Sequence, residues 1–195
     1  GRVAVRASHP QSLPVSAAAP AIATVAVPRN LLRGARRPQI ALVGLAQTGK
    51  STIFQAASST AVESGFLADS RLGFDACLVN IGLEQAALVD LPALRTLHDL
   101  QDADRLLLMA LLGGETGHGG KGGFKAPDVL IQVVDATALE PNLALSQELC
   151  QLGKPLVIAL NRLDEARERG IYINVEALST ALGVPVVPTV AHMGK

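Results

Sequence analysis

The chain has 195 residues, of which 49% are apolar and 17% charged, and its formal net charge at pH 7 is zero. This composition excludes a disordered chain, and the neutral charge argues against a strongly electrostatic binder of nucleic acid or of a membrane surface. No apolar stretch is long enough to span a bilayer, so we expect a soluble protein with one core. The two cysteines, Cys77 and Cys150, have no metal-binding spacing and predict two buried free thiols.

The first 37 residues differ in composition from the rest of the chain. They are rich in Ala, Pro, Val and Ser, and they end in a basic cluster. The spacing of the prolines interrupts any signal-peptide core and suits an extended arm or linker. We interpret the basic cluster as the solvated end of that linker rather than a contact with phosphate or lipid headgroups. The predicted organisation is therefore an arm over residues 1–37 and one domain over residues 38–195.

The domain begins with a phosphate-binding loop. The apolar run Ile40–Val43 predicts a strand, the pattern Gly44-x-x-x-x-Gly49-Lys50-Ser51 follows it, and Ser51–Ser58 predicts a helix. Glycines let backbone N–H groups surround a phosphate chain, and the helix N-terminus adds a favourable dipole. Lys50 is placed to reach the β- and γ-phosphates and the Ser51 hydroxyl to bind Mg²⁺. The candidate nucleotide contacts in this segment are Gly44, Gln47, Thr48, Gly49, Lys50, Ser51 and Thr52.

Strand and helix patterns then alternate to the end of the chain. After a long loop over residues 59–71 come a hairpin, a helix, a flexible Gly-rich segment over residues 113–123, and three apolar strands separated by helices. The predicted strands are Ala76–Ile81, Gln85–Val89, Asp128–Val134, Pro155–Leu160 and Val184–Val187, and the predicted helices are Leu97–Leu112, Asn142–Leu152 and Val175–Leu182. The last three strands read as parallel strands buried on both faces. The predicted fold is a three-layer, doubly wound α/β P-loop NTPase domain, whose mostly parallel sheet includes one antiparallel hairpin strand.

Carboxylates and amides at strand ends extend the site. Asp90 follows the strand Gln85–Val89 and is the candidate Mg²⁺ carboxylate of a nucleotide hydrolase. Asn161-Arg162-Leu163-Asp164 follows a later strand and favours guanine, because the Asp164 carboxylate can accept from the base N1–H and exocyclic amine, whereas adenine would leave it unpaired. Thr189-Val190-Ala191 follows the last strand and offers a backbone N–H to the guanine O6. The candidate base contacts are Asn161, Arg162, Asp164, Thr189, Val190 and Ala191. The charged run over residues 164–169 reads as a solvated helix face.

With these motifs in place, the chain resembles the N-terminal G domain of the FeoB family of bacterial ferrous-iron transport proteins, a Ras-like P-loop GTPase. The resemblance covers about residues 38–195 and is most specific in residues 126–143, in Asp164-Glu165-Ala166 after the guanine motif, and in Leu182–Thr189. It implies binding of GTP, GDP and Mg²⁺, slow GTP hydrolysis, and a place at the cytoplasmic face of the inner membrane. It also implies a helical domain and a membrane transporter domain, with oligomerisation through the membrane part. The chain stops at Lys195, before the last G-domain helix and those domains, so we expect a fragment or a truncated paralogue.

The chain departs from the family pattern at positions that bear on catalysis. Gln47 replaces an Asn associated with potassium-stimulated hydrolysis and keeps an amide oxygen on a longer arm, so a potassium requirement does not carry over directly. Ala93 replaces a Gly, keeps a backbone N–H for the γ-phosphate, and loses freedom at positive φ. Asp75 aligns with a Thr that binds Mg²⁺, and Val190 replaces a Ser. Catalysis is therefore assigned to Lys50 and the Ala93 backbone, and metal binding to Ser51, Asp90 and Asp75.

The main interpretation is a slow GTPase domain that regulates ferrous iron transport. A guanine-nucleotide sensor without catalysis is an alternative, because Ala93 and Asp75 both lie where the γ-phosphate is sensed. An Era-like GTPase acting on ribosomal RNA is disfavoured by the neutral charge, and no nucleic acid partner is expected. In the Ras-like position after Ala93 the chain has Leu94 and Arg95 rather than glutamine, so the group that orients the attacking water is unidentified and Arg95 is expected to face solvent.

Overall fold

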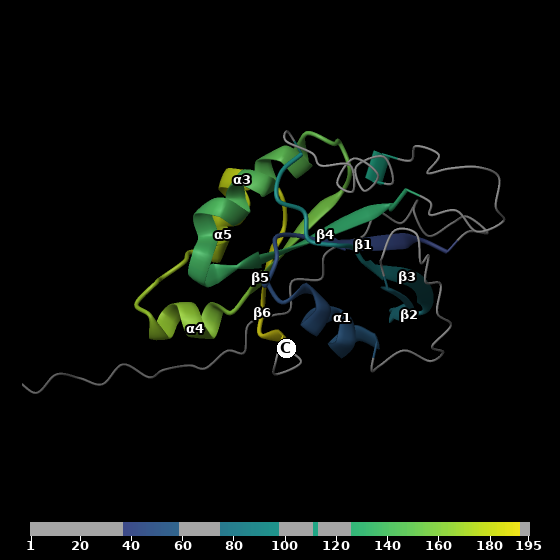
Figure 1. The fold of residues 1–195 in the computed structure, drawn as a ribbon, viewed down its shortest axis with the longest axis horizontal. Helices are drawn as coiled ribbons and strands as arrows, with labels where there is room; N and C mark the ends of the chain where they lie inside the picture. The colour runs from purple at the N-terminus through teal and green to yellow at the C-terminus, as the bar shows by residue number, and fades with distance from the viewer. Residues whose placement is uncertain (1–36, 59–74, 98–110, 113–125, 192–195) are drawn as a thin grey trace, which may run out of the picture.

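A computed structural model describes residues 37–58, 75–97, 111–112 and 126–191 of the chain (Figure 1). A six-stranded sheet forms the centre, in the order β2-β3-β1-β4-β5-β6. Strand β2 pairs antiparallel with β3, and the other neighbouring strands pair in parallel. The strands are β1 (Gln39–Val43), β2 (Asp75–Ile81), β3 (Glu84–Asp90), β4 (Val129–Asp135), β5 (Leu156–Asn161) and β6 (Val186–Thr189). The predicted doubly wound sheet with one antiparallel hairpin is confirmed.

Helices cover the sheet on both faces. They are α1 (Lys50–Ser58), the 3₁₀ turn η2 (Ala136–Ala138), α3 (Leu139–Cys150), α4 (Leu163–Glu168) and α5 (Val175–Leu182). Because successive strand residues point to opposite faces, Ala41 of β1 packs in one core cluster with Leu145 of α3, while Leu42 packs in another with Phe54 of α1. Figure 1 shows α3 and α5 on one side of the sheet and α1 on the other. The result is the predicted three-layer arrangement.

Several boundaries differ from the sequence-based ones for local reasons. Helix α3 starts at Leu139 rather than at Asn142, because Asp135 caps the turn η2 through the Thr137 N–H and the chain continues from that turn into the helix. Strand β6 is Val186–Thr189 rather than 184–187. Strand β6 is also an edge strand of the described sheet without a fully buried residue, so the expectation of burial on both faces is wrong for it, although it is correct for β4 and β5.

Both cysteines are free thiols, as predicted, but their burial differs. Cys77 in β2 is buried against α1, whereas Cys150, the last residue of α3, is exposed. The prediction of two buried thiols is therefore wrong for Cys150, which lies on the helix surface next to the core residue Leu149.

The other predicted segments fall wholly or mainly outside the described residues. These are the arm over residues 1–37, the loop over 59–71, the Gly-rich segment over 113–123, and most of the helix over 97–112. Of that helix, Leu111 and Leu112 are helical and Leu111 is completely buried. Within the described residues, every helix is too short or too polar to cross a bilayer.

Candidate nucleotide-binding site

The loop from Gly44 to Ser51 joins the C-terminal end of β1 to α1. Gly44 has φ +147° and Gly49 has φ +94°, conformations that residues with a Cβ rarely adopt. A Cβ on Gly44 would lie 2.6 Å from the Val133 carbonyl oxygen, and one on Gly49 would lie 2.3 Å from Asn161 Nδ2. The loop therefore approaches β4 and β5 so closely that both positions require glycine. Gln47, with φ +63°, is exposed at the outer turn of the loop.

Lys50 lies beneath the loop with only 8% of its surface exposed. Its Nζ donates to the carbonyls of Gly44 at 3.4 Å and Leu45 at 3.3 Å. Burial lowers the pKa of the Lys50 ammonium, and the negative charge of Asp90 partly opposes that shift. Both hydrogen bonds are long, so the ammonium can exchange them for phosphate oxygens at small cost.

Ser51 and Asp90 meet at the start of α1. Ser51 Oγ donates to Asp90 Oδ2 at 2.8 Å, while the buried Asp90 Oδ1 has no hydrogen-bond partner among the residues that the structure describes. Burial raises the pKa of Asp90, the Ser51 hydrogen bond and the Lys50 charge lower it, and Asp75 raises it. Asp75 is the cross-strand partner of Asp90 in the β2–β3 register, which explains why its charge affects the pKa of Asp90. A hydroxyl beside a carboxylate with an unpartnered oxygen fits the oxygen ligands that Mg²⁺ prefers.

Few other side chains are available to a metal ion. In the parts of the chain that the structure describes, no group of three or more His, Cys, Asp or Glu residues is arranged to hold one. Within these described residues, the further oxygens around a cation at Ser51 and Asp90 would come from a bound phosphate or from water, which is the usual arrangement for Mg²⁺.

The segment after Asp90 is anchored before Ala93 by the Leu91 N–H, which donates to the Leu42 carbonyl at 3.2 Å, and after Ala93 by several further contacts. The Leu94 N–H donates to the Gly44 carbonyl at 3.1 Å, and the Leu94 side chain is completely buried. Further along, Thr96 Oγ1 donates to Glu148 of α3 at 2.8 Å, and the Leu97 N–H donates to the same carboxylate. Ala93 itself is exposed. Gln47 and Arg162 are the only described non-glycine residues with positive φ, so Ala93 does not need the freedom of the glycine it replaces.

The two residues after Ala93 have opposite environments. Leu94 is an apolar side chain in the core and has no group that can orient water. Arg95 is exposed, as expected of a solvent-facing arginine.

Asn161 joins the phosphate loop to the end of the chain. Its buried side chain donates from Nδ2 to the Thr48 carbonyl at 3.0 Å and accepts at Oδ1 from the Ala191 N–H at 3.0 Å. The two bonds bring together segments that are separated by 113 and 30 residues of sequence. Beside them is an open pocket of about 440 Å³, which is lined by Gly49, Thr52, Asn161, Arg162, Asp164, Glu165, Glu168 and Ala191.

The predicted site residues thus fall into two adjoining groups. One group lies in or beside the loop and consists of Gly44, Thr48, Lys50, Ser51 and Asp90. The other lines the pocket and consists of Gly49, Thr52, Asn161, Arg162, Asp164 and Ala191. Thr189 and Val190 are half-buried but are not among the residues that line the pocket. The run over residues 164–169 is only partly a solvated face, because Ala166 is completely buried and Asp164 and Glu165 face the pocket.

The structure adds Asp135, which the sequence analysis did not select. Asp135 ends β4, opposite Asn161 in the parallel register, and its carboxylate contacts Thr137 and Arg162. The sequence did contain a pattern that could have identified Asp135, because it is a carboxylate at the end of an apolar strand, as Asp90 is.

The fold and the loop-and-pocket geometry define a Ras-like P-loop G domain. A family model described as ferrous iron transport protein B matches residues 38–195. The chain therefore belongs to the FeoB family, as an N-terminal G domain.

Individual relatives agree with this assignment. The chain is 36% identical over 157 residues to the Fe(2+) transporter FeoB of Helicobacter pylori, covering 78% of this chain and 22% of that protein. It is 32% identical over 160 residues to the Fe(2+) transporter FeoB of Escherichia coli, covering 80% and 19%. The chain thus spans about a fifth of the length of these curated relatives.

Solved structures give the same picture. The FeoB G domain from Methanococcus jannaschii superposes with a TM-score of 0.65 at 32% identity, over 81% of this chain and 88% of that one. A mutant of S. thermophilus NFeoB bound to GDP superposes with a TM-score of 0.63 at 29% identity, over 80% and 57%.

Proposed function

We propose that this domain binds GTP and GDP together with Mg²⁺ and hydrolyses GTP slowly. The observation that carries the proposal is the Asn161 side chain, which links the phosphate loop at Thr48 to Ala191 beside the pocket. A nucleotide whose phosphates lie in the loop would place its base in the pocket next to Asp164. There the carboxylate accepts from the N1–H and exocyclic amine of guanine, a pair of donors that adenine lacks.

The contacts of the loop residues support phosphate binding. Lys50 exchanges its two long carbonyl contacts for oxygens of the β- and γ-phosphates. Ser51 and Asp90 would hold the metal ion, since their oxygens lie 2.8 Å apart and Asp90 Oδ1 has no partner among the described residues. Bound Mg²⁺ would neutralise the charge that develops on the transferred phosphoryl group. Asp75 is the candidate for a further carboxylate near the metal.

The same geometry supports slow turnover. The exposed Ala93 offers a backbone N–H near the γ-phosphate, but the next residue is the buried Leu94, which cannot orient an attacking water. Catalysis then depends on positioning and on charge neutralisation by Lys50, Mg²⁺ and loop N–H groups. Potassium is a candidate cofactor at Gln47, whose amide oxygen is carried on an exposed side chain of the loop.

At the level of the whole protein, we infer that the domain regulates ferrous iron transport at the cytoplasmic face of the bacterial inner membrane. The similar proteins are named Fe(2+) transporters, and they are several times longer than this chain. The inferred partners are therefore guanine nucleotide and a membrane transporter domain, with oligomerisation through the membrane part.

A nucleotide competition experiment tests the assignment. Labelled GDP is bound in the presence of Mg²⁺ and displaced with GTP, GDP and ATP in parallel. The expected result is displacement by both guanine nucleotides, with ATP weaker by about a hundredfold because adenine offers the Asp164 carboxylate no matching pair of donors. Displacement by ATP as effective as that by GTP contradicts the guanine assignment.

One observation favours a second candidate, a guanine-nucleotide sensor without catalysis. Asp75 is the cross-strand partner of Asp90 and its charge raises the pKa of Asp90, so a second negative charge lies close to the proposed metal site. A turnover assay with GTP, Mg²⁺ and K⁺ separates the candidates: phosphate release supports the GTPase, and binding of both nucleotides without release supports the sensor.

A further inference from the structure

Asp135 lies behind the base pocket rather than in it. It ends β4 with about a tenth of its side chain exposed, and it is not among the residues that line the pocket. Its Oδ1 accepts from the Thr137 N–H at 2.8 Å and from the Thr137 hydroxyl at 2.7 Å. Its Oδ2 accepts from Arg162 Nη1 at 2.9 Å. Both carboxylate oxygens are therefore committed, one to a rigid turn of the backbone and the other to Arg162.

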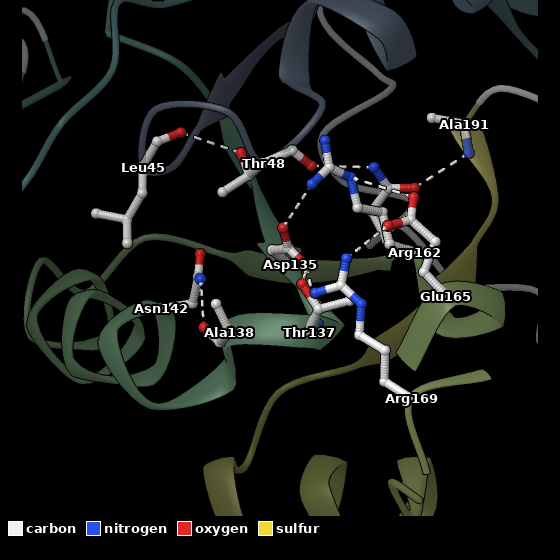
Figure 2. Close-up of polar contacts among 11 residues, drawn as sticks. Leu45, Thr48, Asp135, Thr137, Ala138, Asn142, Arg162, Glu165, Arg169 and Ala191 are labelled. Carbon is white, nitrogen blue, oxygen red and sulfur yellow. Dashed lines mark hydrogen bonds and ion pairs between the residues drawn. The ribbon is translucent and has the colours of Figure 1, made fainter. Parts of the chain in front are cut away.

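Arg162 combines an unusual backbone conformation with a side chain that is anchored to Asp135. Its backbone is left-handed, with φ +60° and ψ +33°, although it is neither Gly nor Asn. Its guanidinium reaches Asp135, while Nε lies 3.8 Å from Glu165 on the pocket side (Figure 2). The shorter contact is the one to the more buried carboxylate, so Asp135 fixes the position of the guanidinium.

The pocket explains why a fixed guanidinium matters. Arg162 lines it together with Asp164, Glu165 and Glu168, so an arginine released from Asp135 would be attracted toward these carboxylates. A guanidinium that stays on the wall presents a flat cation, and a purine ring packs well against such a surface by stacking and cation–π attraction.

Resting on the proposed function, we propose that Asp135 is a positioning residue of the base pocket, which with Thr137 holds the Arg162 guanidinium as the wall against which the guanine ring stacks. Arg162 contacts the face of the base and Asp164 its edge. Asp135 acts only through Arg162 and touches no part of the nucleotide.

The test compares GDP affinity among variants by equilibrium titration with Mg²⁺. Asp135→Asn keeps the size of the side chain but removes its charge, and we expect affinity to fall by about five- to tenfold. Arg162→Met should lose a similar amount, and the double variant should lose no more than either single variant, because both changes break one contact. Arg162→Lys keeps the charge without the plane and should also bind GDP more weakly than wild type.

Two controls separate positioning from general damage. Asp128→Asn alters a carboxylate at the other end of β4, where Asp128 Oδ2 accepts from the Gln39 N–H at 2.8 Å, and it should leave GDP affinity unchanged. Inorganic tripolyphosphate is a probe without a base. Its affinity, measured by the same equilibrium titration, should be equal in wild type and Asp135→Asn.

The outcomes are distinguishable. Wild-type GDP affinity in Asp135→Asn, losses that add in the double variant, or an equal loss of tripolyphosphate binding would each overturn the positioning role while leaving the proposed nucleotide binding intact. Failure of the wild-type protein to bind GDP would overturn the proposed function and this inference together.

Discussion

Replacing Asn161 should disconnect the phosphate loop from the base pocket. In Asn161→Ala, the buried Thr48 carbonyl and the half-buried Ala191 N–H each lose a partner at 3.0 Å. An orphaned buried carbonyl costs about 1–3 kcal/mol, and a group that water can reach costs about 0.5 kcal/mol, so we expect a loss of about 2–3 kcal/mol in the free energy of unfolding. In a domain of this size, that loss lowers the melting temperature by roughly 5–10 °C.

The isosteric variant Asn161→Asp isolates the Thr48 contact. It keeps an acceptor for the Ala191 N–H but turns a carboxylate oxygen toward the Thr48 carbonyl, so it should be at least as destabilising as Asn161→Ala although it leaves no cavity. Differential scanning calorimetry of the nucleotide-free protein and GDP titration measure the two effects, and GDP affinity should fall at least about tenfold in both variants. Melting temperatures within about 1 °C of wild type, together with wild-type GDP affinity, would refute the bridging role.

Three further predictions concern the base, the thiols and the loop. Asp164→Asn should weaken GDP binding by about 10–100-fold and improve binding of xanthosine diphosphate, because an amide can donate to the C2 oxygen of xanthine. Titration with both nucleotides measures this, and an unchanged preference for GDP would contradict the base contact. Cys150 should react with a thiol reagent in the folded protein and Cys77 only after denaturation, because Cys77 is buried and burial raises the pKa of its thiol. Mass spectrometry of the labelled protein measures the extent of reaction at each cysteine. Equal labelling of the two in the folded protein would be inconsistent with this structure. Gln47→Asn should increase the ratio of GTP turnover in K⁺ to that in Na⁺, because the shorter side chain holds its amide oxygen closer to the loop. The same turnover ratio in wild type and variant would show that Gln47 does not limit potassium use.

The phosphate loop was predictable because its chemistry is local. Gly44, Lys50 and Ser51 lie within eight residues, and a loop between an apolar strand and a helix admits few conformations. The sequence, however, explained only part of the reason for glycine at position 49. The sequence explains a positive φ there, but the 2.3 Å approach of a Cβ to Asn161 depends on where β5 lies relative to β1.

Burial at the ends of elements was less predictable. Cys150 lies in an apolar-rich helix and was expected inside, yet it continues the exposed stripe of α3 that includes Ala144 and Gln147. Strand β6 has the composition of a buried strand but forms an edge of the described sheet. Composition records how apolar a segment is, whereas burial depends on what packs against it.

The sequence by itself determined the fold class, the loop, and the identity of the carboxylates and amides that follow β3 and β5, because strand periodicity and glycine spacing are properties of neighbouring residues. Only the tertiary structure decided which of those groups meet. Two sets of contacts depend on the order of the strands in the sheet: those of Asn161 with Thr48 and Ala191, and that of Asp135 with Arg162. Parallel strands place their C-terminal ends on one edge, and this edge brings together residues more than a hundred positions apart.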